Sequence, residues 1–236
     1  MQKKNITHLT VGPIETNCWI YPLGEKDAVV IDPGDEADLI ISALKKLDLF
    51  PAYILLTHGH FDHITAAPKL KMFFTGKSQI AIHSLDAEYL GPDAYNTHSK
   101  SIKAAMGNTA YLDAFWSDSG QIDKPELPPA DCLLEEGGKI GPFTVLHLPG
   151  HSWGSAAFWD KEEGIIFTGD TLFEGTYGRT DLPGGSKDEI FKSLRRLFAM
   201  DGNITVYPGH GRITTIGREA ERSFYKASHN MSTIIN

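Results

Sequence analysis

The seven-residue run 57–63 (Thr-His-Gly-His-Phe-Asp-His) constrains this chain more than any other stretch. It places three imidazoles and one carboxylate within six consecutive positions, and both groups are ligands for divalent ions such as Zn²⁺. The four residues before it, 53–56 (Tyr-Ile-Leu-Leu), are an apolar run that predicts a short buried strand. The ligand cluster is therefore expected to begin where a strand leaves the core.

The spacing inside this run separates the ligands into two sets. His58 and His60 are two positions apart, and Gly59 between them tolerates the tight backbone that lets both side chains converge on one ion. Asp62 and His63 are adjacent, so they point in different directions and suit a second ion nearby. A polar loop with chance histidines is the alternative. It is the weaker interpretation because five of the ten histidines lie in this run or in two later Gly-His turns.

Three later dipeptides repeat one setting, in which a strand end and a glycine precede a metal-binding side chain. They are Gly150-His151, Gly169-Asp170 and Gly209-His210. Each ion would keep an open position for water, as catalytic sites do and structural sites do not. The ligand sets that we expect are His58, His60 and His151 for one ion and Asp62, His63 and His210 for the other, with Asp170 bridging them.

The order of predicted elements contains a near repetition. Strands, a helix over 36–47 and a strand over 53–56 lead into the first ligand run, while strands, a helix over 187–200 and a strand over 204–207 lead into His210. Two similar halves would pack sheet against sheet with their helices outside. We therefore predict the α/β class and a four-layer α/β/β/α sandwich. A length of 236 residues fits one domain spanning 1–236.

Several local predictions accompany this architecture. Asp35 is expected to cap the helix over 36–47, and Ser186 with Glu189 forms a capping box for the helix over 187–200. A helix is expected over 62–74, with Pro68 as an internal irregularity. A final helix is expected over 217–228.

The segment 84–131 is the least patterned part of the chain. Apolar spacing predicts a helix over 101–116 within it. The segment is either a surface excursion or a lid over the pocket, and the sequence leaves both open because long connections are often functional. As a lid it would contact substrate through aromatic residues such as Tyr95, Phe115 and Trp116.

Composition excludes several classes of protein. Lys and Arg number 22 against 30 Asp and Glu, for a net charge of −8, which argues against a nucleic-acid-binding surface. No apolar run reaches the ~18 residues that a membrane-spanning helix needs, and no signal peptide is expected. The only two cysteines, Cys18 and Cys132, do not suggest a disulfide framework, so a cytoplasmic location is expected. The oligomeric state stays open.

In combination, the motifs resemble those of the metallo-β-lactamase superfamily: His-x-His-x-Asp-His at 58–63, then Gly-His, Gly-Asp and Gly-His at 150–151, 169–170 and 209–210. Within it the chain looks most like the hydroxyacylglutathione hydrolases (glyoxalase II). Only 26 residues (211–236) follow His210, so the short bacterial type without the C-terminal helical domain is expected. The stretches that carry this resemblance are 16–18, 30–34, 178–181 and 208–211.

This resemblance implies the four-layer fold, the ligand sets above and a hydrolase of small-molecule thioesters or esters. It implies two divalent ions, with zinc expected and iron or manganese permitted by the ligand types. The nucleophile would be a hydroxide bridging the ions, which Asp62 orients as a catalytic residue. Tyr177 and Arg179 follow Asp170 in the loop where these hydrolases contact substrate. The alternative for both is loop packing and a surface ion pair between Arg179 and Asp181.

Three other functions remain open from the sequence. A persulfide dioxygenase of similar scaffold would use one Fe²⁺ on His58, His151 and Asp170, although the intact second ligand set favours two ions and hydrolysis. A lactonase or a β-lactamase would differ only in its substrate pocket. A non-catalytic binding protein would be expected to have lost a ligand, and none is missing.

Overall fold

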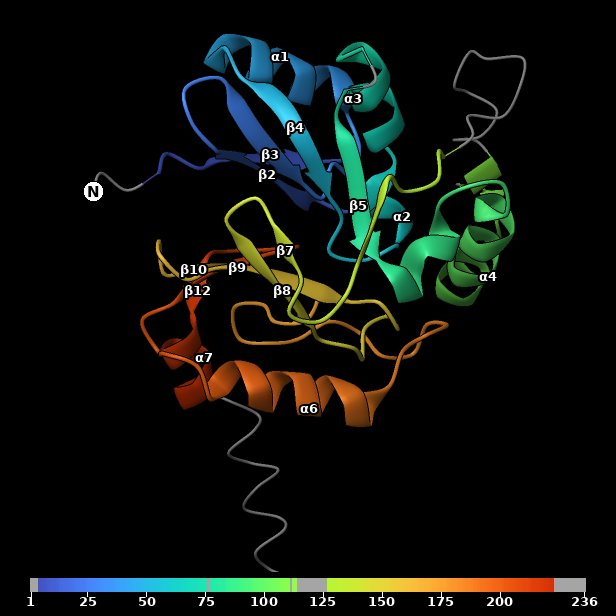
Figure 1. Cartoon of the computed structure of the whole chain (residues 1–236). Coiled ribbons are helices and arrows are strands. Elements are labelled where there is room, and N and C mark those ends of the chain that lie inside the picture. The colour runs from blue at the N-terminus through green and yellow to red at the C-terminus, as the bar shows by residue number, and fades with distance from the viewer. Residues whose placement is uncertain (1–3, 76, 111, 114–126, 223–236) are drawn as a thin grey trace, which may run out of the picture.

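A computed structural model describes residues 4–75, 77–110, 112–113 and 127–222 of the chain. Two six-stranded sheets lie face to face, with α1 (Ala37–Leu47) and α3 (Ala67–Phe73) on the outer side of one sheet (Figure 1). Helices α6 (Lys187–Phe198) and α7 (Ile216–Arg222) lie outside the other. The predicted four-layer α/β/β/α sandwich is confirmed.

The first sheet is mixed and has its strands in chain order. β1 and β2, and β2 and β3, pair antiparallel, whereas β3 with β4, β4 with β5 and β5 with β6 pair parallel. Helix α1 makes the crossover from β3 to β4, as a parallel pair requires. The strands are β1 (Thr7–Val11), β2 (Thr16–Pro22), β3 (Asp27–Ile31), β4 (Phe50–Leu55), β5 (Gln79–His83) and β6 (Cys132–Leu134).

The second sheet runs in the order β12-β11-β10-β9-β8-β7. Its one parallel pair, β10 with β11, is connected through α6, so each half of the chain contains a strand–helix–strand crossover, as the repetition predicts. The strands are β7 (Lys139–Ile140), β8 (Phe143–His147), β9 (Ala156–Asp160), β10 (Ile165–Gly169), β11 (Thr205–Pro208) and β12 (Thr214–Thr215).

Three apolar layers hold the four structural layers together. The layer between the sheets contains Tyr21, Phe143 and Phe167, whose rings meet edge to face at centroid distances of 4.9 Å (Tyr21–Phe143) and 5.8 Å (Phe143–Phe167). A second layer lies between the first sheet and α1 and α3, and a third between the second sheet and α6 and α7. The sheets therefore form a rigid frame whose strand ends are fixed relative to one another.

The helix predicted over 62–74 is wrong as one element. It is two short helices, α2 (Phe61–Ile64) and α3, separated by Thr65 and Ala66. Pro68 explains the break, because its ring would clash with the carbonyl of Ile64 four residues earlier in a continuous helix. Proline is tolerated in the first turn of a helix, and it stands there in α3.

The helix predicted over 101–116 is misplaced. The structure has a short 3₁₀ helix, η1 (Ser84–Tyr89), and then α4 (Ala94–Met106). Gly107 ends α4 in the left-handed region with φ +77°, a conformation that favours glycine and stops a helix. Tyr95 donates a hydrogen bond to Asp113 on the surface. Phe115 and Trp116 lie outside the described residues, and the lid stays a prediction.

The two capping predictions have opposite outcomes. Ser186 accepts a hydrogen bond from the Glu189 amide at the start of α6, which confirms the cap, whereas the Ser186 amide donates to the Gly150 carbonyl oxygen, so the reciprocal bond of a capping box is not formed. Asp35 does not cap α1, because its carboxylate accepts from the amide of Glu36, and Glu36 itself is the left-handed N-cap residue. The helix predicted over 217–228 is observed as α7, and residues beyond 222 lie outside the described part of the chain.

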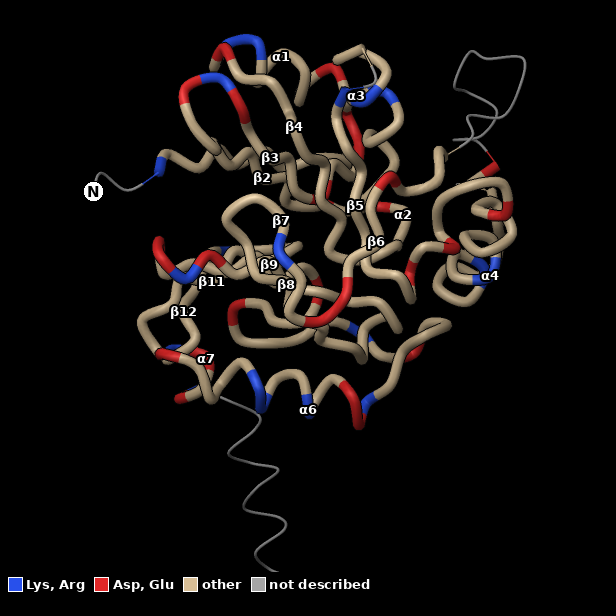
Figure 2. Tube along the Cα trace, viewed as in Figure 1, with Lys and Arg blue, Asp and Glu red and all other residues tan. Residues whose placement is uncertain are grey.

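Residues of both charge signs occur along α1, α6 and α7, whereas the charged residues of α3 are the two lysines Lys69 and Lys71 (Figure 2). Cys18 and Cys132 are both free thiols, as expected from their number. Within the described residues, no helix combines the length and the apolar composition needed to cross a membrane. The absence of nucleic-acid binding and the cytoplasmic location stay predictions.

Candidate metal centre

Four strand ends carry the predicted ligands to one edge of the sandwich. The run 57–63 follows β4, His151 follows β8, Asp170 follows β10 and His210 follows β11. Because the strands are held by the three apolar layers, the loops that leave them start from fixed positions. The structure brings all seven predicted ligands into three overlapping groups: His58, His60 and His151; His58, His63 and Asp170; Asp62, His63 and His210.

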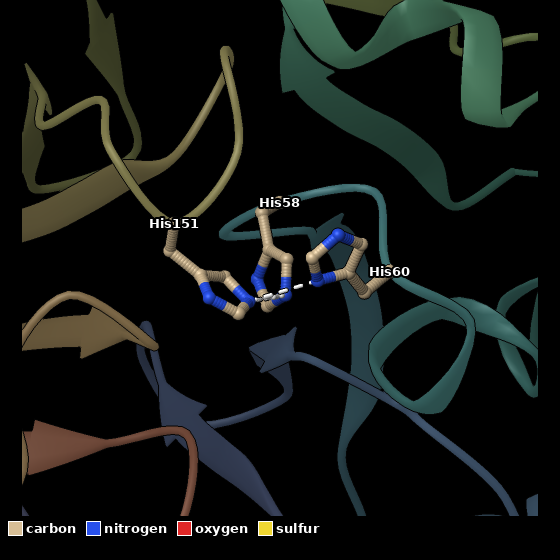
Figure 3. A group of neighbouring side chains, drawn as sticks. All are labelled: His58, His60 and His151. Atoms are coloured by element: carbon tan, nitrogen blue, oxygen red, sulfur yellow. Dashed lines mark hydrogen bonds between the residues drawn. The ribbon is translucent and has the colours of Figure 1, made fainter. Parts of the chain in front are cut away.

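The first group is a cluster of three buried histidines, which we call the three-histidine cluster (His58, His60 and His151). Their rings converge from two loops (Figure 3). Nε2 of His151 lies 3.2 Å from Nε2 of His58 and 2.8 Å from Nδ1 of His60. Three ring nitrogens from positions up to 93 residues apart therefore point at one small volume.

Hydrogen bonds on the far side of two of these rings determine which nitrogen carries the proton. Nδ1 of His151 lies 2.8 Å from the carbonyl oxygen of Arg179, so Nδ1 is the protonated donor and Nε2 carries a lone pair. Nδ1 of His58 lies 3.1 Å from the hydroxyl of Thr57, whose proton goes to the carboxylate of Asp32. The Nε2 atoms of His58 and His151 thus face each other with lone pairs, an arrangement that a cation between them stabilises.

The third group, which we call the aspartate cluster (Asp62, His63 and His210), is more open. Oδ2 of Asp62 lies 3.4 Å from Nε2 of His63 and 3.3 Å from Nε2 of His210. The side chains of Asp62 and His210 are 23% and 22% exposed, whereas that of His63 is fully buried. The hydroxyl of Thr16 donates to Oδ2 of Asp62 over 3.0 Å. Solvent, and hence a substrate, reaches the centre from this side.

Asp170 lies between the two clusters, as a bridging ligand must. One oxygen, Oδ1, is 3.4 Å from Nε2 of His63, and the other, Oδ2, is 3.5 Å from Nε2 of His151. Oδ1 is buried and has no hydrogen-bond partner within the described residues. A buried carboxylate oxygen without a partner is costly, and a bound cation removes that cost.

Glycine makes this position of Asp170 possible. A Cβ atom on Gly209 would lie 2.2 Å from Oδ1 of Asp170 and 2.8 Å from Cε1 of His63. A Cβ atom on Gly178 would lie 2.0 Å from the Asp170 carbonyl oxygen and 2.9 Å from Nδ1 of His151. Any larger residue at either place would displace a ligand.

The charge states of the predicted ligand residues favour a bound cation. Burial lowers the pKa of His58 and of His60 well below the usual range, so both rings are neutral and able to ligate. Burial alone would also lower the pKa of His63, but the carboxylates of Asp62, Asp170 and Asp32 raise it well above its usual value. These groups attract a positive charge to the position that Nε2 of His63 faces. The residues present therefore fit two divalent ions.

Asp32 is a functional residue of the centre that the sequence did not predict. It is buried directly after β3, and its Oδ2 lies 3.0 Å from Nδ1 of His63 and 2.7 Å from the hydroxyl of Thr57. Its Oδ1 accepts from the Thr57 amide over 2.7 Å. One carboxylate thus orients His63 directly and His58 through Thr57. A signal existed, because Asp32 shares the setting of the ligands: a polar residue at the end of an apolar strand.

Asn17, in β2 of the first sheet, holds the loop that carries His210. Its amide N–H donates to the carbonyl oxygen of Gly209 over 2.7 Å. Its side-chain Nδ2 donates to the carbonyl oxygens of Pro208 and Gly211, each over 3.0 Å. The N-terminal half of the chain therefore fixes a ligand that the C-terminal half supplies.

The two predicted substrate residues have other contacts in the structure. The guanidinium of Arg179 forms a bidentate pair with the exposed Asp181, at 2.8 Å for each of the two hydrogen bonds. Tyr177 packs against Phe191 of α6, with ring centroids 5.4 Å apart. Among the contacts of the described residues, Arg179 meets the centre through its carbonyl oxygen, which accepts from His151. Substrate binding by Arg179 and Tyr177 stays a prediction.

Comparison with known proteins agrees with this geometry. Residues 11–210 match the metallo-beta-lactamase superfamily. Hydroxyacylglutathione hydrolase GloC of Haemophilus influenzae is 35% identical over 216 residues, covering 91% of this chain and 94% of GloC.

Two solved structures are similar in sequence as well as in fold. TTHA1623, solved in a di-iron-bound form, is 36% identical with a TM-score of 0.76, and the match covers 93% of this chain and 99% of that one. BLEG-1, a B3 metallo-beta-lactamase, is 33% identical with a TM-score of 0.78, and the match covers 94% of this chain and 99% of that one. The chain belongs to the metallo-beta-lactamase superfamily.

Proposed function

We propose that this protein is a dinuclear metal-dependent hydrolase whose substrates are thioesters of the hydroxyacylglutathione type. The observation that carries the proposal is the pair of clusters joined by Asp170, because seven ligand side chains from four loops converge with none missing. When bound, two divalent ions acidify a coordinated water and polarise the scissile carbonyl. The similarity to GloC supports a thioester over other carbonyl substrates.

The chain's own residues have distinct roles in this reaction. Asp62 lies at the exposed side of the centre, where its carboxylate accepts a hydrogen bond from the nucleophilic water and orients it. Its pKa is held well below the usual range: burial would raise it, but His63 and His210 lower it more. Asp62 therefore stays ionised as a hydrogen-bond acceptor. The leaving thiolate needs no proton donor in the cleavage step, since the thiol pKa of about 8.5 makes it a weakly basic leaving group that takes up its proton from solvent afterwards.

The substrate proposal is tested by comparing kcat/KM across one panel. The panel contains a hydroxyacylglutathione thioester, a thioester that lacks glutathione, the oxygen-ester analogue of the first, a homoserine lactone and a β-lactam. The thioester is expected to be hydrolysed fastest. Equal rates with a thioester that lacks glutathione would retain the reaction and overturn the glutathione part of the substrate.

β-Lactam hydrolysis is the second candidate, because BLEG-1 is a B3 metallo-beta-lactamase and matches 94% of the chain at 33% identity. The same clusters serve both reactions, since each begins with attack on a carbonyl carbon. A β-lactam hydrolysed with a kcat/KM above that of the thioester would make this the primary function.

The nature of the ions is a separate proposal. Imidazole and carboxylate ligands suit zinc, iron and manganese, and TTHA1623 holds two irons. We propose two ions per chain, with zinc as the first choice. Elemental analysis of untagged protein is expected to find about two equivalents. A single iron per chain, together with oxygen consumption in the presence of a persulfide, would instead support a dioxygenase.

A further inference from the structure

Asp86 is a buried carboxylate that the proposed reaction does not use. It lies in η1, the 3₁₀ helix that follows β5, and its exposure is 0%. Among the described residues, no Lys or Arg forms an ion pair with it. A buried carboxylate without a cationic partner is costly unless hydrogen-bond donors surround it. The hydrogen-bond donors around Asp86 therefore indicate what this carboxylate does in the structure.

Three donors surround Asp86, and they come from the two loops of the three-histidine cluster. The Gly59 amide donates to Oδ2 over 2.9 Å, and Gly59 is the residue between His58 and His60. The Ser152 hydroxyl donates to the same oxygen over 2.7 Å, and Ser152 follows His151. The Gly154 amide donates to Oδ1 over 2.6 Å.

Each of the two loops packs closely against η1 at a glycine. A Cβ atom on Gly59 would lie 2.2 Å from Cδ2 of Tyr89, and one on Gly154 would lie 2.6 Å from the carboxyl carbon of Asp86. Tyr89 is held in turn by α4, because Nε2 of His98 donates to its carbonyl oxygen over 2.9 Å. Asp86 is thus fixed on a support behind the loops, and its two oxygens bind one loop to the other.

The aspartate cluster is held by different residues. Asp32 orients His63, Thr16 donates to Asp62, and the backbone around His210 is held by Asn17. None of the hydrogen bonds described for Asp86 goes to these residues. The two clusters therefore have separate supports, although Asp32 also reaches His58 through Thr57.

We propose that Asp86 is a positioning residue for the three-histidine cluster. Its carboxylate fixes the separation of the His58–His60 loop from the His151 loop, and so sets the affinity of that cluster for its ion without setting the affinity of the aspartate cluster. Small displacements of a ligand weaken a metal site strongly, since distances must agree within about 0.2 Å. The inference rests on the proposed metal centre.

The test uses Asp86→Asn, which keeps the size of the side chain. In either orientation the new amide group points an N–H at a backbone N–H, that of Gly59 or that of Gly154, so one loop loses its acceptor. Stepwise zinc affinities are measured on metal-free full-length protein by competition with a chromophoric chelator. One of the two binding steps is expected to weaken by about tenfold or more, and the other to stay as in the wild type.

Asp160 provides a matched control. It is also a buried carboxylate, 3% exposed, and it also accepts from one hydroxyl and two backbone amides, those of Tyr21, Glu162 and Glu163. It joins the two sheets at a distance from the centre. Asp160→Asn is expected to lower Tm while leaving both zinc affinities unchanged, which separates positioning from loss of stability.

The zinc affinities of Asp86→Asn and of the wild type test the inference and the proposed function separately. Wild-type affinity at both steps in Asp86→Asn, or equal weakening of both steps, would overturn the inference while leaving the dinuclear centre intact. A wild-type protein that binds no zinc, iron or manganese would overturn the proposed function itself. If Asp86→Asn does not fold, Ser152→Ala is measured instead, because it removes a single donor to Asp86. It is expected to weaken one of the two zinc-binding steps severalfold and to leave the other unchanged. Wild-type affinity at both steps would overturn the inference.

Discussion

The three-histidine cluster and the aspartate cluster differ in burial, charge and support. The first is buried, and its His151 and His58 rings direct their Nδ1 protons outward to the Arg179 carbonyl oxygen and to Thr57. The second is partly open, contains the ionised Asp62 and is oriented by the carboxylate of Asp32. The comparison indicates a division of tasks, in which the buried cluster holds its ion and the open cluster meets water and substrate.

The sharpest test of this division is Asp62→Ala. We expect turnover to fall by about 10³-fold or more, because both a ligand and the group that orients the water are lost. The fold should persist, since Asp62 lies at the solvent side and outside the three apolar layers. Rates and thermal unfolding of the same sample check this, with His60→Ala as the buried counterpart. Near-wild-type activity in either variant would contradict the ligand assignment.

Asp32→Asn tests the support of the open cluster. Asp32 has φ +51°, a left-handed conformation that asparagine tolerates, so the backbone should be unaffected. The side-chain amide cannot accept from both His63 and Thr57 while also accepting from the Thr57 amide. We expect zinc affinity to fall by about 10–100-fold, measured by chelator competition. An unchanged affinity would show that His63 is oriented without Asp32.

Removal of the ions should proceed in two phases. The ion of the aspartate cluster is expected to leave first, because Asp62 and His210 are over a fifth exposed whereas His58, His60 and His151 are buried. Chelator is added in excess, and metal loss and activity are followed in time. Activity should disappear in the fast phase, with one ion still bound. A single phase for both ions would argue against the difference between the clusters.

Protonation of His98 is expected to have a smaller effect, a loss of folding stability within a defined pH range. Burial lowers its pKa to about 4, against an ordinary value of 6.5, so its neutral form is favoured in the folded protein. Its contribution is complete above pH 6.5 and is lost as the pH falls towards 4, amounting to about 3 kcal/mol. Urea unfolding of wild type and His98→Gln across this range measures it. The same slope in both proteins would exclude His98 as the cause.

The smallest effect is expected from Arg179→Ala. The substitution removes an exposed ion pair with Asp181, which contributes little to stability because solvent screens it, but it keeps the carbonyl oxygen that accepts from His151. Metal content should therefore be unchanged. If the guanidinium binds substrate, KM rises severalfold at constant kcat, as steady-state kinetics would show. An unchanged KM would remove Arg179 from the substrate site.

The sequence predicted which side chains would come together because each one follows an apolar strand, and strands that run in the same direction have their carboxyl ends at a common edge. It predicted the layers for a related reason: a helix between two apolar strands implies a parallel pair. The predicted helix bounds were wrong where a glycine or a proline interrupts the apolar spacing. Gly107 ends α4 earlier than the apolar spacing suggests, and Pro68 divides α2 from α3.

The supports of the centre were harder to predict than its ligands. Asp32 and Asp86 act through donors that lie 25 to 68 residues away in sequence, and no spacing rule connects them with Thr57, Ser152 or Gly154. Only the pairing of the strands determines which loops meet. From the sequence, a carboxylate near a strand end can be named only as a candidate positioning residue. The structure is needed to show which groups donate hydrogen bonds to it.

The contacts of Asn17 with the loop around His210 have a consequence for folding. They join positions 191 and 194 residues apart, so this loop reaches its final place only after the two sheets have docked. Contacts of such high sequence separation form late and slowly. The centre is therefore expected to be completed only after the two halves of the chain have come together, and ion uptake during refolding would report that moment.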